Sequence, residues 1–482
     1  MEEKKQGISE DWLSVWIGLF IFVLSLGVFF ELDILGFGVT TRIWTDLSKA
    51  LHPVSDKYAG LGGVGSLIVT YLFLLGVMTA GAAALKADIK RFIIGFTAVF
   101  FISYICWVTG SLANIAATTP AELQKFGITW SLKLTSEAGF VVALIVGLVV
   151  GNFSPGFAEA INEAVRPEWY IKTAIVILGG FLGVTAAEKL GLATAVMFAG
   201  LCAIVVAYLI YWALVYFIAR KYFRFSREWA APLASGISIC GVSAAIATGA
   251  AIRARPVVPI MVSSLVVIFA VVELLILPFM AQNFLYKEPM VAGAWMGLAV
   301  KTDGAAVASG AVADSLIRAK ALAADGINYA EGWVMGTATT VKVFIDIFIG
   351  VWAFILAIIW CSVIECKPGE RVRPGQIWER FPKFVIGYVA TFLLILYLGV
   401  TYPDLIGKIK AAMAEGNVFR GIFFTMTFFT IGVMSNFRRL WEEGIGRLAA
   451  VYILCLFGFI IWIGLLISWL FFHGVKPPVI TG

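Results

Sequence analysis

Hydrophobic runs recur along the whole chain, and they limit its fold more than any other feature. Each run is about 20 residues long, which is enough to cross a bilayer as one helix. Hydrophobic residues make up 61% of the chain and charged residues 14%, whereas a soluble domain is about half apolar and a quarter charged. The runs are continuous and lack the alternation of a membrane β-barrel. We therefore predict an all-α polytopic membrane protein.

The hydropathy pattern predicts about 13 transmembrane helices. The first begins after the polar segment 1–11 and has no small-residue cleavage site, so we expect a retained span rather than a signal peptide. The polar segment 40–58 is expected to be an interfacial helix or an ordered loop. The spans are predicted at residues 12–30, 62–85, 92–114, 134–152, 171–187, 192–219, 229–252, 257–285, 288–314, 332–362, 383–401, 418–436 and 446–472.

Lysine and arginine in the loops predict the orientation. In this span assignment the two densest basic clusters, at 220–227 and 367–375, fall on the same side as the N-terminus. Because basic loops stay in the cytoplasm, we expect a cytoplasmic N-terminus and a location in the cell inner membrane. A short similarity between 74–92 and 429–447, each with Gly-Val-Met before a charged loop, suggests inverted repeats, which are common in transporters.

The first candidate site is the small-residue cluster within the predicted span 229–252. Serine, glycine and cysteine propagate a helix poorly, and a half-helix that starts at such a break directs its N–H groups and positive dipole end at the break, which favours an anion. The alternative is a tight contact between two helices, since small residues let backbones approach. The candidate ligands here are Ser238, Cys240, Gly241 and Ser243.

The second candidate site lies within the predicted span 288–314. An ionisable residue in mid-span usually faces a cavity or a partner. Lys301 is interpreted as a fixed cation beside an anionic substrate, and Asp303 as its counter-charge or as the carrier of a coupling proton. The alternative is an ion pair that only joins two helices. The candidate ligands here are Lys301, Thr302, Asp303, Gly304 and Ser309.

Four further ionisable residues lie in apolar runs. Lys342 and Asp346 are four residues apart and so share one helix face, where they either contact substrate or neutralise each other. Glu273 and Glu137 either hydrogen-bond to a neighbouring helix or carry a proton. Lys342 is a candidate substrate ligand, and Asp346 and Glu273 join Asp303 as candidate coupling residues.

Other classes of function find little support. The six cysteines form no Cys-x-x-Cys pair, and the two histidines, His52 and His473, are too few for a haem or zinc site, so neither a metal nor another cofactor is expected. The basic net charge of +6 lies in short loops, where it sets topology rather than binding nucleic acid. No His-Glu-x-x-His or Gly-x-Ser-x-Gly motif is present, so an enzyme is not expected.

Four segments resemble, in order, the YeiH-like sulfate exporter family: GISICGVSAAIATGAAI, WMGLAVKTDGAAVASGAVAD, TTVKVF and FFTIGVMSNFRRL. The similarity covers roughly residues 134–472. It implies a fold similar to bile-acid symporters and sodium/proton antiporters, with inverted repeats and two discontinuous crossing helices, here 229–252 and 288–314. The implied division is 1–133 as additional N-terminal spans, 134–362 as the family core, 363–382 as a cytoplasmic linker and 383–482 as C-terminal spans.

The sequence departs from the family pattern at one place. The family usually has a histidine–aspartate pair after Trp-x-Gly, where this chain has Lys301 and Thr302, and its acid follows at Asp303. Lys342 matches a family lysine, but Ile345 replaces the arginine that the family has three residues later. A different substrate or coupling ion is therefore expected.

The sequence favours a secondary transporter of a small anion, such as sulfate or a sulfonate, that works by alternating access as an exporter or exchanger. The alternative is a cation/proton antiporter on the same scaffold, with Asp303, Glu273 and Asp346 as carriers and Lys301 as a counter-ion. The expected partners are the anion, a coupling proton or sodium ion and the lipid bilayer, and a homodimer stays open.

Overall fold

The structure is a computed structural model that describes residues 9–117, 120–132, 136, 138–188, 190–252, 254–255, 257–360, 364, 382–435 and 446–480. It confirms an all-α membrane protein: within these residues nine helices are long and apolar enough to cross a bilayer, and three more apolar helices are shorter. The chain forms two compact units. Unit 1 comprises residues 1–192 and 383–434, and unit 2 comprises 193–382 and 435–482.

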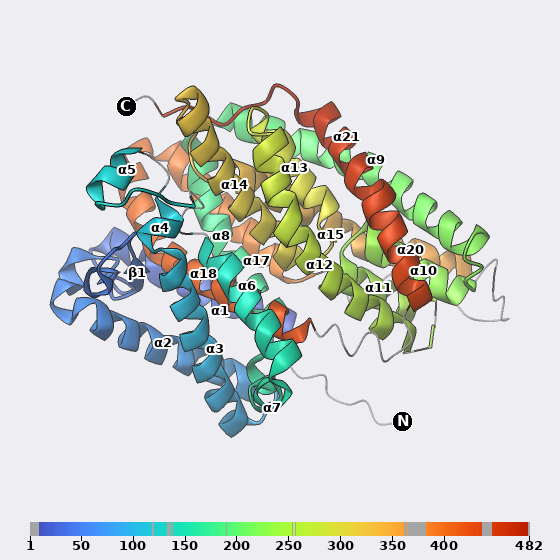
Figure 1. Ribbon diagram of the computed structural model, residues 1–482, viewed down its shortest axis with the longest axis horizontal. Helices are drawn as coiled ribbons and strands as arrows, with labels where there is room; N and C mark the ends of the chain where they lie inside the picture. The colour runs from blue at the N-terminus through green and yellow to red at the C-terminus, as the bar shows by residue number, and fades with distance from the viewer. Residues whose placement is uncertain are drawn as a thin grey trace. The chain divides into compact units, whose positions relative to one another are not determined.

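Among the described residues, unit 1 has seven principal helices and several short helical elements. The principal helices are labelled in Figure 1. Its principal helices are α1 (Glu10–Ser25), α2 (Gly62–Ala84), α3 (Ile89–Gly110), α6 (Ala138–Phe153), α8 (Pro167–Glu188), α17 (Phe384–Thr401) and α18 (Ile406–Met434). Its short elements are η1 (Leu26–Phe30), η2 (Leu47–Lys49), η3 (Asp56–Leu61), α4 (Ala113–Ala116), α5 (Pro120–Lys125), α7 (Pro155–Ala160), η4 (Asn162–Ala164) and η6 (Pro403–Leu405).

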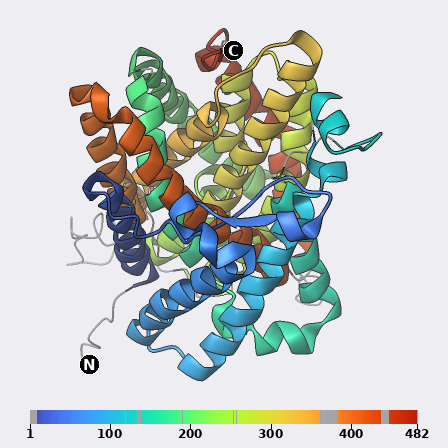
Figure 2. The same ribbon diagram turned by 90° about the vertical axis from the view of Figure 1, so that its left-hand side faces the viewer.

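The segment 40–58 proves to be an ordered loop. Strands β1 (Val39–Thr41) and β2 (Leu51–Pro53) pair antiparallel, with Thr40 opposite His52. Figure 2 shows this short ribbon beside α2, which it contacts. The Thr40 hydroxyl donates to the His52 carbonyl at 3.2 Å and so reinforces the pair.

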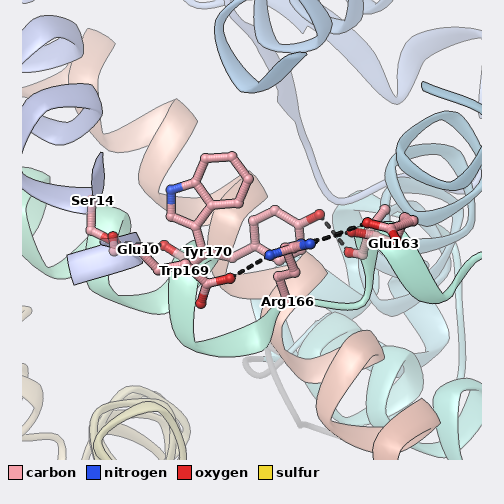
Figure 3. A network of polar contacts seen from close by, with 7 residues as sticks. Glu10, Ser14, Glu163, Arg166, Trp169 and Tyr170 are labelled. Atoms are coloured by element: carbon pink, nitrogen blue, oxygen red, sulfur yellow. Dashed lines mark hydrogen bonds and ion pairs between the residues drawn. The ribbon is translucent and has the colours of Figure 1, made fainter. Parts of the chain in front are cut away.

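Charged side chains join the starts of α1 and α8 (Figure 3). The Arg166 guanidinium lies between Glu10, at 2.5 Å, and Glu163, at 3.2 Å. Nearby, Lys172 pairs with Asp11 at 2.7 Å. These pairs place the N-terminal segment and residues 163–172 at one end of unit 1.

Glycines let the helices of unit 1 pack closely. Lipid offers little hydrophobic drive between helices, so membrane interfaces favour small residues that bring backbones together. A Cβ added at Gly432 on α18 would lie 2.5 Å from the Leu144 carbonyl oxygen and 2.7 Å from the Leu148 nitrogen of α6. Both neighbours are backbone atoms and cannot move aside. At Gly421, on the same helix, an added Cβ would meet no atom within 4 Å.

Unit 2 is built from helices with two interruptions that lie where the sequence predicted them. The elements are α9 (Leu190–Lys221, most of which lies in unit 2), α10 (Arg227–Ser238), α11 (Gly241–Ala251), α12 (Val257–Phe284), α13 (Pro289–Ala299), α14 (Asp303–Asp325), α15 (Trp333–Ile359), α20 (Gly446–Cys455), the π-helical turn η7 (Leu456–Ile460) and α21 (Ile461–Phe472).

Helices α10 and α11 form a hairpin, which we call hairpin 1 (227–251). The Thr248 hydroxyl donates to the Ser235 hydroxyl at 2.7 Å. At the open end of the hairpin, Arg255 binds Glu228 through its guanidinium at 3.0 Å. Ser235 and Thr248 are 13 residues apart, so along a straight helix they would lie about 20 Å from each other. The chain therefore reverses at Ile239 and Cys240, the tip of hairpin 1.

Helix α13 and the first part of α14 form a second hairpin, which we call hairpin 2 (289–315). A Cβ added at Gly297 of α13 would lie 2.7 Å from the Ala338 carbonyl oxygen, and one added at Gly310 of α14 would lie 2.6 Å from the Ala338 Cβ. One residue of α15 thus contacts both arms at the same level. The tip of hairpin 2 is the segment 300–302.

Helix α12 connects the two hairpins and sets their depth. Near its start, Pro259 lies 3.0 Å from the position of a Cβ at Gly249 in hairpin 1. Near its end, the Gln282 amide donates to the Leu316 carbonyl just beyond hairpin 2 at 3.5 Å. At about 1.5 Å per residue its 28 residues span about 42 Å, more than a bilayer core of about 30 Å. The hairpins therefore enter unit 2 from opposite ends.

This geometry corrects one expectation. The predicted spans 229–252 and 288–314 are discontinuous, as expected, but neither spans the membrane. Each forms a hairpin that returns to the end of unit 2 from which it came. Each arm of hairpin 1 has 11 or 12 residues, about 17 Å, which is half of a bilayer core. Replacing two predicted spans by two hairpins leaves all later helices of unit 2 with unchanged direction. It also gives the opposite entry that inverted repeats require.

Gly432→Ala should destabilise unit 1, because the added methyl group meets immovable backbone atoms. Overpacking of this kind costs about 1–3 kcal/mol. Thermal unfolding in detergent should show a lower apparent melting temperature. Gly421→Ala is the matched control and should be neutral or slightly stabilising, since alanine favours helix over glycine by about 1 kcal/mol. Equal effects of the two variants would contradict the α6–α18 contact.

Cysteines at Ser235 and Thr248, in a background without native cysteines, should form a disulfide. Their side-chain oxygens are in contact, and a disulfide requires neighbouring Cβ atoms. Mass spectrometry of the oxidised protein should find the linked peptides, and neither single-cysteine variant should give them. A failure of the double variant to link under oxidant would favour a straight crossing helix.

Candidate functional site

The tips of the two hairpins meet beside the middle of α12. The Gly241 N–H, which opens α11, donates to the Lys301 carbonyl at 2.6 Å. A Cβ added at Gly241 would collide with the Val266 side chain of α12 and lie 2.8 Å from the Lys301 carbonyl oxygen. Only glycine allows this approach. The two interruptions predicted from sequence therefore form one structural site.

Lys342 of α15 binds the carbonyl ends of both hairpins. Its ammonium group donates to Ile239 O at 3.1 Å and to Val300 O at 3.4 Å, and the side chain is 1% exposed. Helices α10 and α13 end at these carbonyls, where a helix carries its partial negative charge. Inside a membrane such groups need a partner from the protein. One lysine therefore stabilises both interruptions.

Lys301 projects from the tip of hairpin 2 and is fully buried, at 0% exposed. Its ammonium group donates to Leu298 O at 2.5 Å and lies 4.9 Å from the centre of the Tyr211 ring on α9. An ammonium group has three N–H donors. Among the described residues only one of them makes a hydrogen bond, so the group keeps donors for a further acceptor.

Glu273 of α12 faces the same tip and is also 0% exposed. Its Oε2 accepts the Lys301 backbone N–H at 3.1 Å. Its Oε1 is buried and has no hydrogen-bond partner within the described part of the chain. A carboxyl oxygen left unpaired at this depth is costly, so it marks a place where another group binds.

Two serine hydroxyls predicted as ligands are buried within the hairpins. Ser238 ends α10 and Ser309 lies on α14, and neither Oγ has a hydrogen-bond partner among the residues that the structure describes. Cys240 is buried at the tip of hairpin 1. Buried polar groups are nearly always paired, so two unpaired hydroxyls in the two hairpins favour a polar site over simple packing.

The remaining predicted ligands lie at the starts of α11 and α14 or on α15. Thr302 precedes α14 and accepts the Ala305 N–H at 3.2 Å, which caps the helix. Gly304 and Asp303 form the first turn of α14, Ser243 lies in the first turn of α11, and Asp346 lies on α15. The side chains of Ser243, Asp303 and Asp346 lie outside the described residues, and so does Glu137. Their roles stay predictions.

Sequence reasoning missed two tyrosines. The Tyr211 hydroxyl and the Tyr452 hydroxyl are buried, and neither has a hydrogen-bond partner in the described ranges. Tyr452, on α20, lies close enough to Glu273 for their charges to interact, and its ring stacks on Phe269 with centroids 4.8 Å apart. The available signal was a tyrosine in the middle of a predicted span. Aromatic residues are common in apolar runs, so neither tyrosine was distinctive.

Another acid, Asp314 at the open end of hairpin 2, has a structural role. The Asp314 carboxylate accepts the Val334 N–H at 2.9 Å and the Arg318 guanidinium at 2.7 Å. It therefore fixes the N-terminal end of α15 and, through it, the position of Lys342. Over the part of the chain that the structure describes, no group of three or more His, Cys, Asp or Glu residues could hold a metal ion.

Comparison with known proteins places this architecture in a family. Residues 123–451, which include both hairpins, match the family described as "Conserved hypothetical protein 698". A UPF0324 membrane protein of Nitrosomonas europaea is 42% identical over 98% of this chain and 97% of its own length. The chain belongs to the UPF0324 family. This confirms the YeiH-like family resemblance, and the N-terminal helices are shared with that relative.

Other similar proteins extend the comparison. A UPF0324 membrane protein of Rhodopirellula baltica is 30% identical over 86% of this chain and 67% of its own length. An uncharacterized protein of Archaeoglobus fulgidus is 52% identical over 30% of this chain and 88% of its own length. No solved structure matches this UPF0324 protein.

Lys342→Met should destabilise this UPF0324 protein, because it removes the donor of both tip carbonyls. Hydrogen bonds to a charged group contribute about 1.5–3 kcal/mol each. The apparent melting temperature in detergent should fall. Lys320→Met, at a partly exposed lysine of α14 that binds Asn283 at 3.2 Å, is the matched control and should stay near the wild-type value. Similar melting temperatures for both variants would refute a stabilising role for Lys342.

Proposed function

We propose that this UPF0324 protein is a secondary active transporter of a small anion, such as sulfate or a sulfonate, and that the anion binds where the two hairpin tips meet. The observation that carries the proposal is Lys301, a fully buried ammonium group with unused donors at the tip of hairpin 2. In the same two hairpins the buried hydroxyls of Ser238 and Ser309 have no partner among the described residues. A buried cation with incomplete hydrogen bonding suits an anionic ligand.

The helix dipoles support an anion at the same place. Helices α11 and α14 both begin at the tips, so their positive ends face the site, while Lys342 occupies the negative ends of α10 and α13. The combination leaves positive potential at the site. Gly241 leaves no room for a Cβ at the start of α11, so the backbone there can approach a ligand closely.

The depth of the site suits alternating access. Gly241 contacts Val266 and Lys301 contacts Glu273, and both positions lie near the middle of the 28-residue α12. A substrate held there is about equally far from both ends of α12, and one hairpin enters from each end. The direction that we propose is export or exchange. We also propose the cell inner membrane as the location, with a cytoplasmic N-terminus, from the basic loops.

A purely structural lysine and a cation/proton antiporter are the competing explanations. In the first, Lys301 serves only to bind Leu298 O; in the second, Glu273 carries a cation and Lys301 balances its charge. A thermal-shift screen of the purified protein against sulfate, sulfite, sulfonates, carboxylates and sodium chloride separates them. An anion at 100 times its Kd should add about 2.7 kcal/mol of stability, whereas stabilisation by sodium alone would favour the antiporter.

Lys301→Ala should remove anion binding and transport more than it destabilises the protein. Loss of one buried, charged partner weakens binding by about 2–5 kcal/mol, roughly 30-fold or more in affinity. Uptake of labelled sulfate into proteoliposomes and the thermal shift by sulfate should both be lost. Lys320→Ala is the control and should keep both. If Lys301→Ala gives less folded protein but normal specific activity, Lys301 is structural.

A further inference from the structure

Glu273 is the described carboxyl group of unit 2 that is both fully buried and incompletely bonded. One oxygen accepts the Lys301 N–H, and Oε1 has no partner in the described ranges. An ionised carboxylate away from water is costly unless all of its oxygens are paired. Binding a proton at Oε1 removes the charge, and that oxygen is the one left free.

The titratable groups around Glu273 come from several elements of unit 2. Lys301 faces it from the tip of hairpin 2, Lys342 from α15 and the Tyr452 hydroxyl from α20. Helices α11 and α13 contain no ionisable residue. The ionisable residues of α10 lie at its start, where Glu228 pairs with Arg255. On α14, Asp314 binds the start of α15, and the Asp303 side chain lies outside the described residues.

The charge state of Glu273 decides how much positive charge an anion meets. The ionised carboxylate neutralises one of the two neighbouring lysines, and it also repels an anion placed at the tips. The protonated carboxyl leaves both ammonium charges uncompensated by Glu273. A proton on Glu273 therefore strengthens anion binding, and by linkage a bound anion strengthens proton binding by the same factor.

We propose that Glu273 is the coupling site and that one proton binds it together with each anion, so that transport is proton–anion symport. This rests on the proposed anion transport. The proton comes from water on the face at which the anion enters, forms an O–H bond at Oε1, and returns to water on the opposite face when the anion leaves. No other bond forms or breaks.

Titration calorimetry of the full-length protein with sulfate, in buffers that differ in ionisation enthalpy, measures the protons taken up per anion. The wild-type protein should take up about one proton, and its affinity should fall about tenfold per pH unit on the alkaline side of the transition. Glu273→Gln, which mimics the protonated carboxyl, should bind sulfate with no proton uptake and with an affinity independent of pH.

Glu415→Gln is the matched control. Glu415 is a buried glutamate on α18 of unit 1 that accepts the Leu35 N–H at 3.3 Å, and it lies outside the hairpins. This variant should keep the wild-type proton uptake. Loss of uptake in Glu415→Gln, with retention in Glu273→Gln, would move the proton site to unit 1 and overturn the proposal. Sulfate binding by the wild type without proton uptake would overturn it even if Glu273→Gln fails to fold.

Infrared difference spectra between acidic and alkaline buffer test the proton site with no anion present. One carbonyl band of a buried carboxylic acid should appear in the wild type and in Glu415→Gln but not in Glu273→Gln. Any band of the buried Glu415 should instead be missing only in Glu415→Gln. If that band is found and no anion of the screen binds, anion transport fails although Glu273 is a proton site. If sulfate binds and the band is insensitive to Glu273→Gln, the anion function stands and this coupling site is wrong.

Discussion

A helix that ends in the middle of a membrane leaves backbone carbonyls that need hydrogen-bond donors. The rest of unit 2 depends on which group supplies those donors. Two half-helices, α10 and α13, end at Ile239 and Val300, and a single buried ammonium group, that of Lys342, binds both ends. Because one donor group serves both tips, the hairpins hold a common depth and α15 must lie against both. The contact between Gly241 and Lys301 then closes the arrangement from the other side. Stability and the candidate site therefore share the same few atoms.

Much of the fold could be predicted from the sequence because membrane helices are governed by length and hydropathy. The interruptions could be predicted as well, since clusters such as 235–243 combine weak helix formers with small polar groups. Lys301, Lys342 and Glu273 stood out because ionisable residues are rare at this depth. The structure brings these three together. Contact between segments this far apart follows from tertiary packing, which no local pattern contains.

The reversal of the two interrupted segments was harder to predict, because a straight broken helix and a hairpin have the same hydropathy. One signal was present. The loop 253–256 carries two arginines and joins the predicted spans 229–252 and 257–285, so a crossing span 229–252 puts it on the side opposite the basic cluster 220–227. In the structure, however, Arg255 binds Glu228 at the open end of hairpin 1. Placing both basic loops on one side would have required a hairpin. Predicting 229–252 and 288–314 as spans reversed the direction twice, so the predicted direction of the helices after them was unaffected.

The distance in sequence between Ile239 and Lys342 has a consequence for biosynthesis. The two residues are 103 positions apart, and a ribosome that adds about 5–20 residues per second needs about 5–20 s to make that length. During this interval hairpin 1 exists without the ammonium group that binds its tip. Until α15 is made, the Ile239 carbonyl at the tip must accept its hydrogen bond from water, a lipid headgroup or the insertion machinery. Hairpin 1 therefore reaches its final depth late, after the chain that completes it has left the ribosome.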